Sequence, residues 1–212
     1  MNPQDTELAR VAAELGVELS PAQRSTLLDY LALLQRWNAT YNLTAVREPA
    51  AMFTQHLADC LAVLPPLARH APGGRLLDVG SGGGLPGVVI AVALPAWQVT
   101  CVDTVGKKMA FVRQAAGTLG LRNLQARHAR VEALADPAFD LITSRAFASL
   151  ADFVTLTRQH LAPQGVWMAM KGRVPDDEIA ALPADVEVFH VEHLQVPGLD
   201  AQRCLVWMRP RA

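Results

Sequence analysis

Cysteine and long apolar runs are scarce in this sequence, and each scarcity excludes a class of protein. The three cysteines, Cys60, Cys101 and Cys204, lie far apart, with no Cys-x-x-Cys pair and no clustered histidines. This excludes a disulfide framework and a zinc site, and it favours a reducing compartment. The longest apolar run, 87–94, is far shorter than the ~20 residues of a membrane span, and the first residues lack the pattern of a signal peptide. We therefore expect a soluble, cytoplasmic protein with no metal and no membrane partner.

The charges nearly cancel, and the chain is long and apolar enough to form its own core. It has 212 residues, of which 51% are hydrophobic and 18% charged, with 19 basic residues against 20 acidic ones. This balance excludes a disordered polyelectrolyte and a histone-like nucleic-acid binder. Only the middle of the chain, residues 71–150, is net positive. Binding to a polyanion would therefore involve a local patch.

Residues 1–70 have the pattern of helices. Apolar residues at helical spacing predict a first helix that ends before Gly16. The motif Ser-Pro-Ala-Gln at 20–23 combines a cap hydroxyl, a first-turn proline and a capping-box glutamine, which predicts a second helix up to about Trp37. After an irregular stretch, a third helix is expected to begin at Pro49 and to end near the proline pair 65–66.

From Arg75 onward, short apolar runs alternate with helical stretches, which predicts βαβ units and a parallel sheet. We expect strands at 76–79, 98–103, 124–126, 140–143 and 166–170, and helices at 87–94, 107–119 and 150–161. Two last runs, 186–191 and 205–208, predict an antiparallel pair at the sheet edge. The expected fold class is α/β, a Rossmann-like doubly wound sheet on residues 71–212, with a helical extension on residues 1–70.

The segment 78–87, Asp-Val-Gly-Ser-Gly-Gly-Gly-Leu-Pro-Gly, is the densest motif of the chain and lies between a predicted strand and a predicted helix. Glycines let a backbone turn sharply and approach a ligand, so a nucleoside or nucleotide cofactor is implied. Gly82, Gly84 and Gly87 fit the dinucleotide pattern G-x-G-x-x-G. Asp78 with Gly80, Gly82 and Gly84 fits the acidic-x-G-x-G-x-G pattern of S-adenosylmethionine-dependent methyltransferases. A turn that serves only packing is the third interpretation.

Two aspartates bear on the choice of cofactor. Asp103, at the end of the next predicted strand, suits either ligand, because a carboxylate there accepts hydrogen bonds from ribose hydroxyls. Asp78 favours the methyl donor, because its charge repels a pyrophosphate but attracts the ammonium and sulfonium groups of S-adenosylmethionine. An NAD(P)-dependent oxidoreductase and a non-catalytic nucleoside-binding module are the alternative functions.

The residues after the fourth predicted strand, 144–147, limit which chemical groups can be the methyl acceptor. They lack the Asp/Asn-Pro-Pro-Tyr/Phe signature typical of amino-group methyltransferases, and no cysteine lies nearby to act as the nucleophile of a pyrimidine C5 enzyme. An acceptor that is already nucleophilic is left, and guanine N7 has an in-plane lone pair and no proton to lose. Transfer to it moves a positive charge from sulfur to the purine. We therefore expect alignment to matter and no acid or base to be required.

Six blocks of the sequence, taken in order, resemble the RsmG (GidB) proteins, which are bacterial 16S ribosomal RNA guanine-N7 methyltransferases. The blocks are 37–47, 56–59, 78–87, 144–148, 170–172 and 194–200. The resemblance implies a class I methyltransferase fold, S-adenosylmethionine as the donor, and one guanine of 16S ribosomal RNA or the small ribosomal subunit as the acceptor. It also implies that Gly80 and Leu85 lie in the donor loop, that Val131 and Glu132 flank the adenine, and that Arg145 lies in the donor site. We expect the protein to be a monomer.

Guanine N7 lies in the deep major groove of A-form RNA, so the target base has to be unpaired or extruded. Arg145 can reach guanine O6, hold the methyl donor or bind a phosphate, and the sequence does not choose between these roles. Lys171, Asn42 and Tyr41 are further candidates for the acceptor pocket, as is His56, for which packing is the alternative. Six basic residues of the middle third mark either an RNA footprint or a solvated face: Lys107, Lys108, Arg113, Arg122, Arg127 and Arg130.

Overall fold

The computed structural model describes residues 3–136, 138–145 and 147–211, so Ala146 in the block 144–148 lies outside the described residues. Helices come first: α1 (Pro3–Glu14), α2 (Pro21–Tyr41), α3 (Pro49–Met52), a π-helical turn (Phe53–Ala58), α4 (Asp59–Leu61) and α5 (Leu64–His70). Strands and helices then alternate: β1 (Gly74–Val79), α6 (Gly87–Ala93), β2 (Trp97–Asp103), α7 (Gly106–Thr118), β3 (Leu124–His128), β4 (Phe139–Ser144), α8 (Leu150–Thr157), β5 (Leu161–Lys171), α9 (Asp176–Ala180), β6 (Val186–Leu194) and β7 (Arg203–Pro210).

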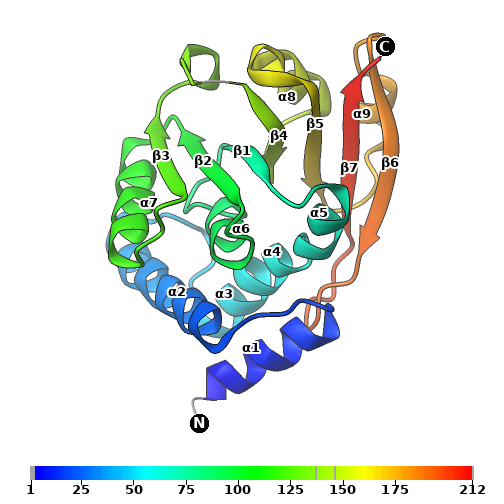
Figure 1. Ribbon diagram of the computed structural model, residues 1–212. Coiled ribbons are helices and arrows are strands. Elements are labelled where there is room, and N and C mark those ends of the chain that lie inside the picture. Colours follow the sequence, from blue (N-terminus) through cyan, green and yellow to red (C-terminus); the bar gives the residue numbers. More distant parts are fainter. Residues whose placement is uncertain (1–2, 137, 146, 212) are drawn as a thin grey trace.

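The seven strands form one sheet in the order β3-β2-β1-β4-β5-β7-β6, which Figure 1 shows from left to right. The first five strands pair in parallel, and β7 pairs antiparallel with both β5 and β6. The predicted antiparallel pair at the sheet edge is therefore confirmed. The carboxyl ends of β1, β2, β4 and β5 meet at one edge of the sheet, where ligands bind in folds of this class.

Alternate residues of the central strands enter two different cores, so both faces of the sheet are covered. Leu76 of β1 and Leu141 of β4 belong to the cluster that includes residues of α2, α6 and α7. The next residues along, Leu77 and Ile142, belong to the cluster that includes residues of α8. Such burial on both faces is typical of a doubly wound parallel sheet. The predicted α/β fold class is confirmed.

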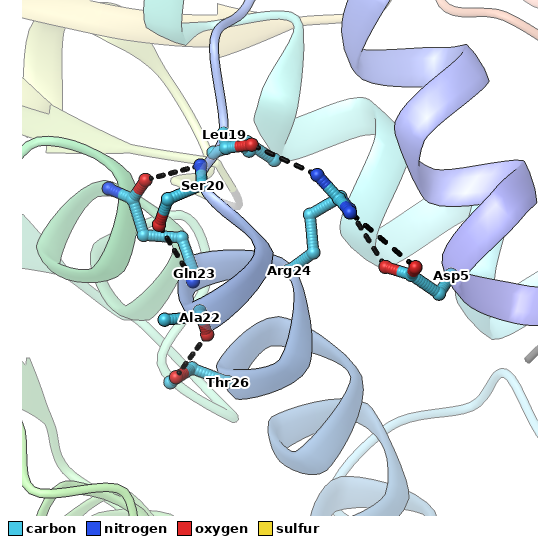
Figure 2. Close-up of polar contacts among 7 residues, drawn as sticks. All are labelled: Asp5, Leu19, Ser20, Ala22, Gln23, Arg24 and Thr26. Carbon is cyan, nitrogen blue, oxygen red and sulfur yellow. Dashed lines mark hydrogen bonds and ion pairs between the residues drawn. The ribbon is translucent and has the colours of Figure 1, made fainter. Parts of the chain in front are cut away.

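The second helix begins as predicted and ends later than predicted. The hydroxyl of Ser20 accepts a hydrogen bond from the Gln23 amide at 3.2 Å, and the Gln23 side chain accepts one from the Ser20 amide at 2.9 Å, as Figure 2 shows. Figure 2 also shows the Arg24 guanidinium bonded to Asp5, which joins α2 to α1. The predicted end at Trp37 is wrong, because the helix continues to Tyr41. Asn42 then adopts the left-handed conformation (φ 50°) that ends it.

The predicted third helix begins at Pro49 as expected, and its backbone stays helical through α3, the π-helical turn and α4 to Leu61. The prolines at 65–66 come after that end and lie in the first turn of a further helix, α5, which the sequence pattern does not predict separately. Proline suits a first turn, because the missing amide hydrogen has no helical partner there. The predicted helix at 150–161 is also shorter, since α8 ends at Thr157 and a 3-10 turn leads into β5.

The helical extension and the sheet are packed together. One hydrophobic cluster contains Leu8 and Leu27 of the extension together with Val99 and Leu205 of the sheet. The division of the chain at residues 70 and 71 therefore stays a prediction. Among the described residues, no helix is both long enough and apolar enough to cross a membrane.

Candidate active site

The glycine loop after β1 is built from backbone conformations that favour glycine. Gly80, Gly82 and Gly84 have φ values of +66°, +58° and +90°. At Gly84 an added Cβ would also lie 2.6 Å from Val88 Cγ2, so packing explains this glycine. At Gly80 and Gly82 an added Cβ would meet nothing within 4 Å. These two glycines border open space, which is the property a ligand-binding loop requires.

Asp103 lies at the end of β2 beside this loop, as predicted. Its Oδ2 accepts a hydrogen bond from the Gly82 amide at 3.0 Å, and its Oδ1 accepts one from the Val105 amide at 2.8 Å. The Lys108 ammonium lies 3.8 Å from Oδ2. An ionised carboxylate can accept about four hydrogen bonds, so Asp103 is held in place and keeps capacity for ligand hydroxyls.

A cavity of about 340 Å³ opens beside Asp103. Four of the predicted donor-site residues meet in it, and its described lining is Val79, Gly80, Val102, Asp103, Thr104, Ala129, Arg130, Val131, Glu132, Phe147, Ala148 and Leu156. The Glu132 backbone amide and the Arg130 guanidinium lower the pKa of the Glu132 carboxyl. The cavity lies within the size range of small-ligand sites, about 300 to 1,000 Å³.

Asp78 lies in β1, two residues before Gly80, and its side chain is buried. It is fully buried below the loop, where its Oδ2 accepts a hydrogen bond from the Gly87 amide at 2.8 Å. Burial raises the pKa of its carboxyl to about 7. Its Oδ1 has no hydrogen-bond partner. A buried acceptor without a partner is unusual in proteins, so Oδ1 has free capacity for a donor from a ligand or a water molecule. Leu85, also predicted for the donor loop, is buried as well.

A second cavity, of about 250 Å³, lies at the carboxyl ends of β4 and β5. Three of the five predicted acceptor-site residues, His56, Arg145 and Lys171, meet in it. The rest of its described lining is Gln55, Asp59, Met170, Gly172 and Arg203. The structure thus brings the π-helical turn of the extension against the end of the sheet, and the two cavities adjoin the same segment, since Arg145 lines one and Phe147 the other.

Asp59 joins two arginines in this second cavity. Its Oδ1 accepts a hydrogen bond from Arg203 Nε at 2.7 Å, and its Oδ2 lies 3.7 Å from Arg145 Nη1. The same Arg145 nitrogen donates to the Gln55 carbonyl of the π-helical turn at 3.1 Å. One carboxylate thus holds two guanidinium groups, and the cluster keeps a net positive charge. Arg203 is not among the predicted site residues. The sequence could have pointed to it only as a basic residue at the start of an apolar strand.

The other two predicted residues of this cavity are also constrained. The Lys171 ammonium pairs with the Glu178 carboxylate of α9 at 2.7 Å. His56 is buried, with its Nε2 2.9 Å from the Thr44 hydroxyl. Burial, followed by the positive charge of Arg145, lowers the pKa of His56 to about 4. The imidazole is therefore neutral at physiological pH and adds no charge to the cavity.

Tyr41 and Asn42 do not line either cavity. Tyr41 is 45% exposed at the end of α2, where its ring packs on Trp37 with the centroids 4.9 Å apart. The Asn42 side-chain oxygen accepts a hydrogen bond from Arg47 at 2.5 Å. Their predicted role at the acceptor stays a prediction.

The predicted basic patch divides into two groups. Lys108, Arg127 and Arg130 lie close to the carboxylates of Asp103, Asp136 and Glu132, respectively. The other three, Lys107, Arg113 and Arg122, are exposed. The described residues contain no group of three or more histidine, cysteine, aspartate or glutamate side chains suited to a metal ion.

Comparison with known proteins identifies related methyltransferases. The family rRNA small subunit methyltransferase G (GidB) matches residues 23–206. The chain is 64% identical to Ribosomal RNA small subunit methyltransferase G of Acidovorax sp. (strain JS42), over 95% of this chain and 93% of the relative. It is 62% identical to the protein of the same name from Leptothrix cholodnii, over 100% of this chain and 98% of the relative.

Solved structures of methyltransferases share the fold. TrmN from Thermus thermophilus is 25% identical, with a TM-score of 0.58 over 71% of this chain and 48% of that chain. The glycopeptide N-methyltransferase MtfA, complexed with S-adenosylmethionine, is 14% identical, with a TM-score of 0.60 over 71% of this chain and 87% of that chain, and shows likeness of fold alone. The family match and the identities with full-length relatives establish that this chain belongs to the rRNA small subunit methyltransferase G family.

Proposed function

We propose that this protein transfers a methyl group from S-adenosylmethionine to N7 of a guanine in 16S ribosomal RNA. The observation that carries the proposal is the pair of cavities on either side of the segment after β4. One has a loop and a carboxylate suited to a nucleoside, and the other has two arginines suited to the acceptor edge of a base or to a phosphate. A donor and an acceptor bound in them would meet at this segment.

The residues of the first cavity fit S-adenosylmethionine. Asp103 has the remaining acceptor capacity that ribose hydroxyls need, and the open side of Gly80 admits close approach of a ligand. Val131 and Glu132 line the same cavity as Asp103, which supports our proposal that they flank the adenine. The unpartnered Oδ1 of Asp78 supplies an acceptor for a cationic group behind the loop. When bound, S-adenosylmethionine supplies a methyl group activated by a positively charged sulfur.

The second cavity fits an acceptor that needs no deprotonation. Asp59 is the one carboxylate among its described lining residues, and it is already paired with Arg203. His56, neutral and bonded to the Thr44 hydroxyl, is placed to shape the wall of the cavity. Arg145 and Arg203 can donate hydrogen bonds to guanine O6 or to a phosphate of an extruded nucleotide. These residues would align N7 with the methyl group, and alignment of reacting groups is worth about 7 to 11 kcal/mol of barrier.

Family membership also favours this function over the alternatives. The relatives are named as methyltransferases, which argues against an NAD(P)-dependent oxidoreductase and against a non-catalytic nucleoside-binding module. We also propose that the protein works as a monomer in the cytoplasm. The three cysteines are free and buried, which suits a reducing compartment.

The proposal is tested by incubating the purified protein with S-adenosylmethionine carrying a labelled methyl group and with small ribosomal subunits from cells that lack the enzyme. Digestion of the RNA to nucleosides then identifies the modified base. We expect label in 7-methylguanosine at one position of 16S RNA. Label on an exocyclic amine or on a pyrimidine carbon would contradict the N7 assignment. The Asp103→Asn variant is the matched control, because it removes the charge proposed to bind the ribose of the donor and should incorporate less label.

A further inference from the structure

The helical extension makes a direct polar contact with the glycine loop. Tyr30 of α2 is fully buried, and its hydroxyl donates a hydrogen bond to the Gly83 carbonyl at 2.7 Å. The Tyr30 ring packs near Phe111 of α7, with the centroids 6.1 Å apart. A phenol hydroxyl inside a core normally requires a partner, and here that partner is the backbone of the loop.

The Gly83 position also contacts α2 closely. A Cβ added there would lie 3.0 Å from Leu34 Cδ1 and 3.8 Å from the Tyr30 hydroxyl oxygen. The peptide group between Gly83 and Gly84 is held at both ends. Its carbonyl accepts from Tyr30, and its amide, that of Gly84, donates to the Ser81 carbonyl at 2.8 Å. Removal of the Tyr30 hydroxyl would free one end of this peptide.

A second contact joins α2 to the helix that follows the loop. The Gln23 side-chain nitrogen donates to the carbonyls of Val92 and Ala93, at 3.0 and 3.1 Å, at the end of α6. The oxygen of the same side chain is used in the capping box of α2, as Figure 2 shows. The glycine loop leads into α6 at Gly87, whose amide binds Asp78. Helix α2 therefore contacts the loop through Tyr30 and the carboxyl end of α6 through Gln23.

We propose, building on the donor site proposed above, that Tyr30 is a positioning residue for the methyl donor, whose hydroxyl orients the Gly83–Gly84 peptide and thereby sets the affinity of the loop for S-adenosylmethionine. The extension is then a structural part of the donor site as well as a neighbour of the acceptor cavity. Burial raises the pKa of Tyr30 well above its ordinary value, so the phenol stays a hydrogen-bond donor at physiological pH.

The test compares Tyr30→Phe with Ser20→Ala in the full-length protein. Both changes weaken α2, one by a buried hydrogen bond and the other by an N-cap, but only the first removes a contact to the loop. Calorimetric titration with S-adenosylhomocysteine is expected to show a Kd about 3- to 10-fold higher for Tyr30→Phe, because the peptide that the hydroxyl no longer orients must be ordered when the ligand binds, and an unchanged Kd for Ser20→Ala. With methyl donor in excess, kcat of Tyr30→Phe should stay at the wild-type value while the KM for the donor rises.

Each outcome separates this inference from the proposed function. If the wild-type protein binds S-adenosylhomocysteine and Tyr30→Phe binds it equally well, the inference is wrong and the proposed function stands. If both variants weaken binding to the same degree, the cause is helix stability, which also contradicts the inference. If the wild-type protein does not bind S-adenosylhomocysteine, the proposed function fails and the inference with it.

A spectroscopic measurement covers the case in which Tyr30→Phe does not fold. The chain has only 2 tyrosines, Tyr30 and Tyr41. Tyr41→Phe protein labelled with 3-fluorotyrosine therefore gives one fluorine resonance, from Tyr30. We expect saturating S-adenosylhomocysteine to shift this resonance, because the loop peptide is its hydrogen-bond partner. A resonance that does not move in protein shown by calorimetry to bind the ligand would overturn the inference.

Discussion

Replacement of Asp78 by asparagine is expected to stabilise the protein above neutral pH and at the same time to weaken donor binding. The carboxyl group is fully buried, and burial raises its pKa from 3.8 to about 7. A difference of about 3 pKa units corresponds to about 4 kcal/mol of unfavourable free energy when the group is ionised in the folded protein. An asparagine oxygen can still accept the hydrogen bond from the Gly87 amide.

The sign of the pH dependence follows from the direction of the shift. Below the unfolded-state pKa the carboxyl is neutral in both states, so its burial carries no ionisation cost. As the pH rises toward 7, the unfolded chain ionises while the folded chain keeps its proton, and the folded state loses stability. Above the folded pKa the cost is constant. Between about pH 5 and about pH 8, the free energy of unfolding of Asp78→Asn minus that of the wild type should therefore rise by about 2 to 3 kcal/mol.

Urea unfolding of ligand-free protein at several pH values measures this difference. The same protein is then titrated with S-adenosylmethionine, for which the variant should show a higher Kd at pH 8, since the cationic ligand favours an ionised carboxylate behind the loop. Wild-type affinity should increase with pH up to about 7 and then level off. A stability difference that does not change with pH would refute the raised pKa, and an unchanged Kd would refute a role of Asp78 in binding.

The remaining predictions concern the ribose contact, the acceptor cavity and the basic surface. Asp103→Asn should raise the Kd for S-adenosylhomocysteine by about 10- to 100-fold, the worth of a charged hydrogen bond, and an unchanged calorimetric Kd would contradict its role. Asp59→Asn should raise the KM for small subunits in a methyl-transfer assay and leave the donor Kd unchanged, because Arg145 and Arg203 lose their common anchor. Lys107→Ala with Arg113→Ala should lower the slope of log affinity for RNA against log salt by about 1 per contact removed, and an equal slope would assign these residues to a solvated face.

Local signals in the sequence predict the sheet, the glycine loop and the position of Asp103, whereas Val131 and Glu132 of the first cavity come from the family resemblance. The alternation of apolar runs and the glycine loop place β1, β2 and Asp103 correctly, because a strand, a tight turn and a helix are each determined by adjacent residues. The start of α2 is also predicted by adjacent residues, because the capping box of Ser20 and Gln23 determines it. Its end is signalled less clearly, because the left-handed residue that ends it is Asn42, and asparagine takes this conformation less often than glycine.

The second cavity, which we propose binds the acceptor, was only partly predictable, because its residues come from distant parts of the chain. Asp59 follows the π-helical turn, which no motif signals, and Arg203 begins β7, far away in sequence. Their ion pair exists only because β7 inserts between β5 and β6. Tyr30 was missed for the same reason, since its apolar spacing marks a core residue and its hydrogen bond to Gly83 appears only after the extension packs on the loop.

Parallel calorimetric titrations of the wild-type protein with S-adenosylhomocysteine and with NAD test the central claim most directly. A single site that binds S-adenosylhomocysteine, with no heat from NAD, is the result that the donor cavity predicts. Binding of NAD at that site, with no binding of S-adenosylhomocysteine, would contradict the account of the glycine loop and of both aspartates.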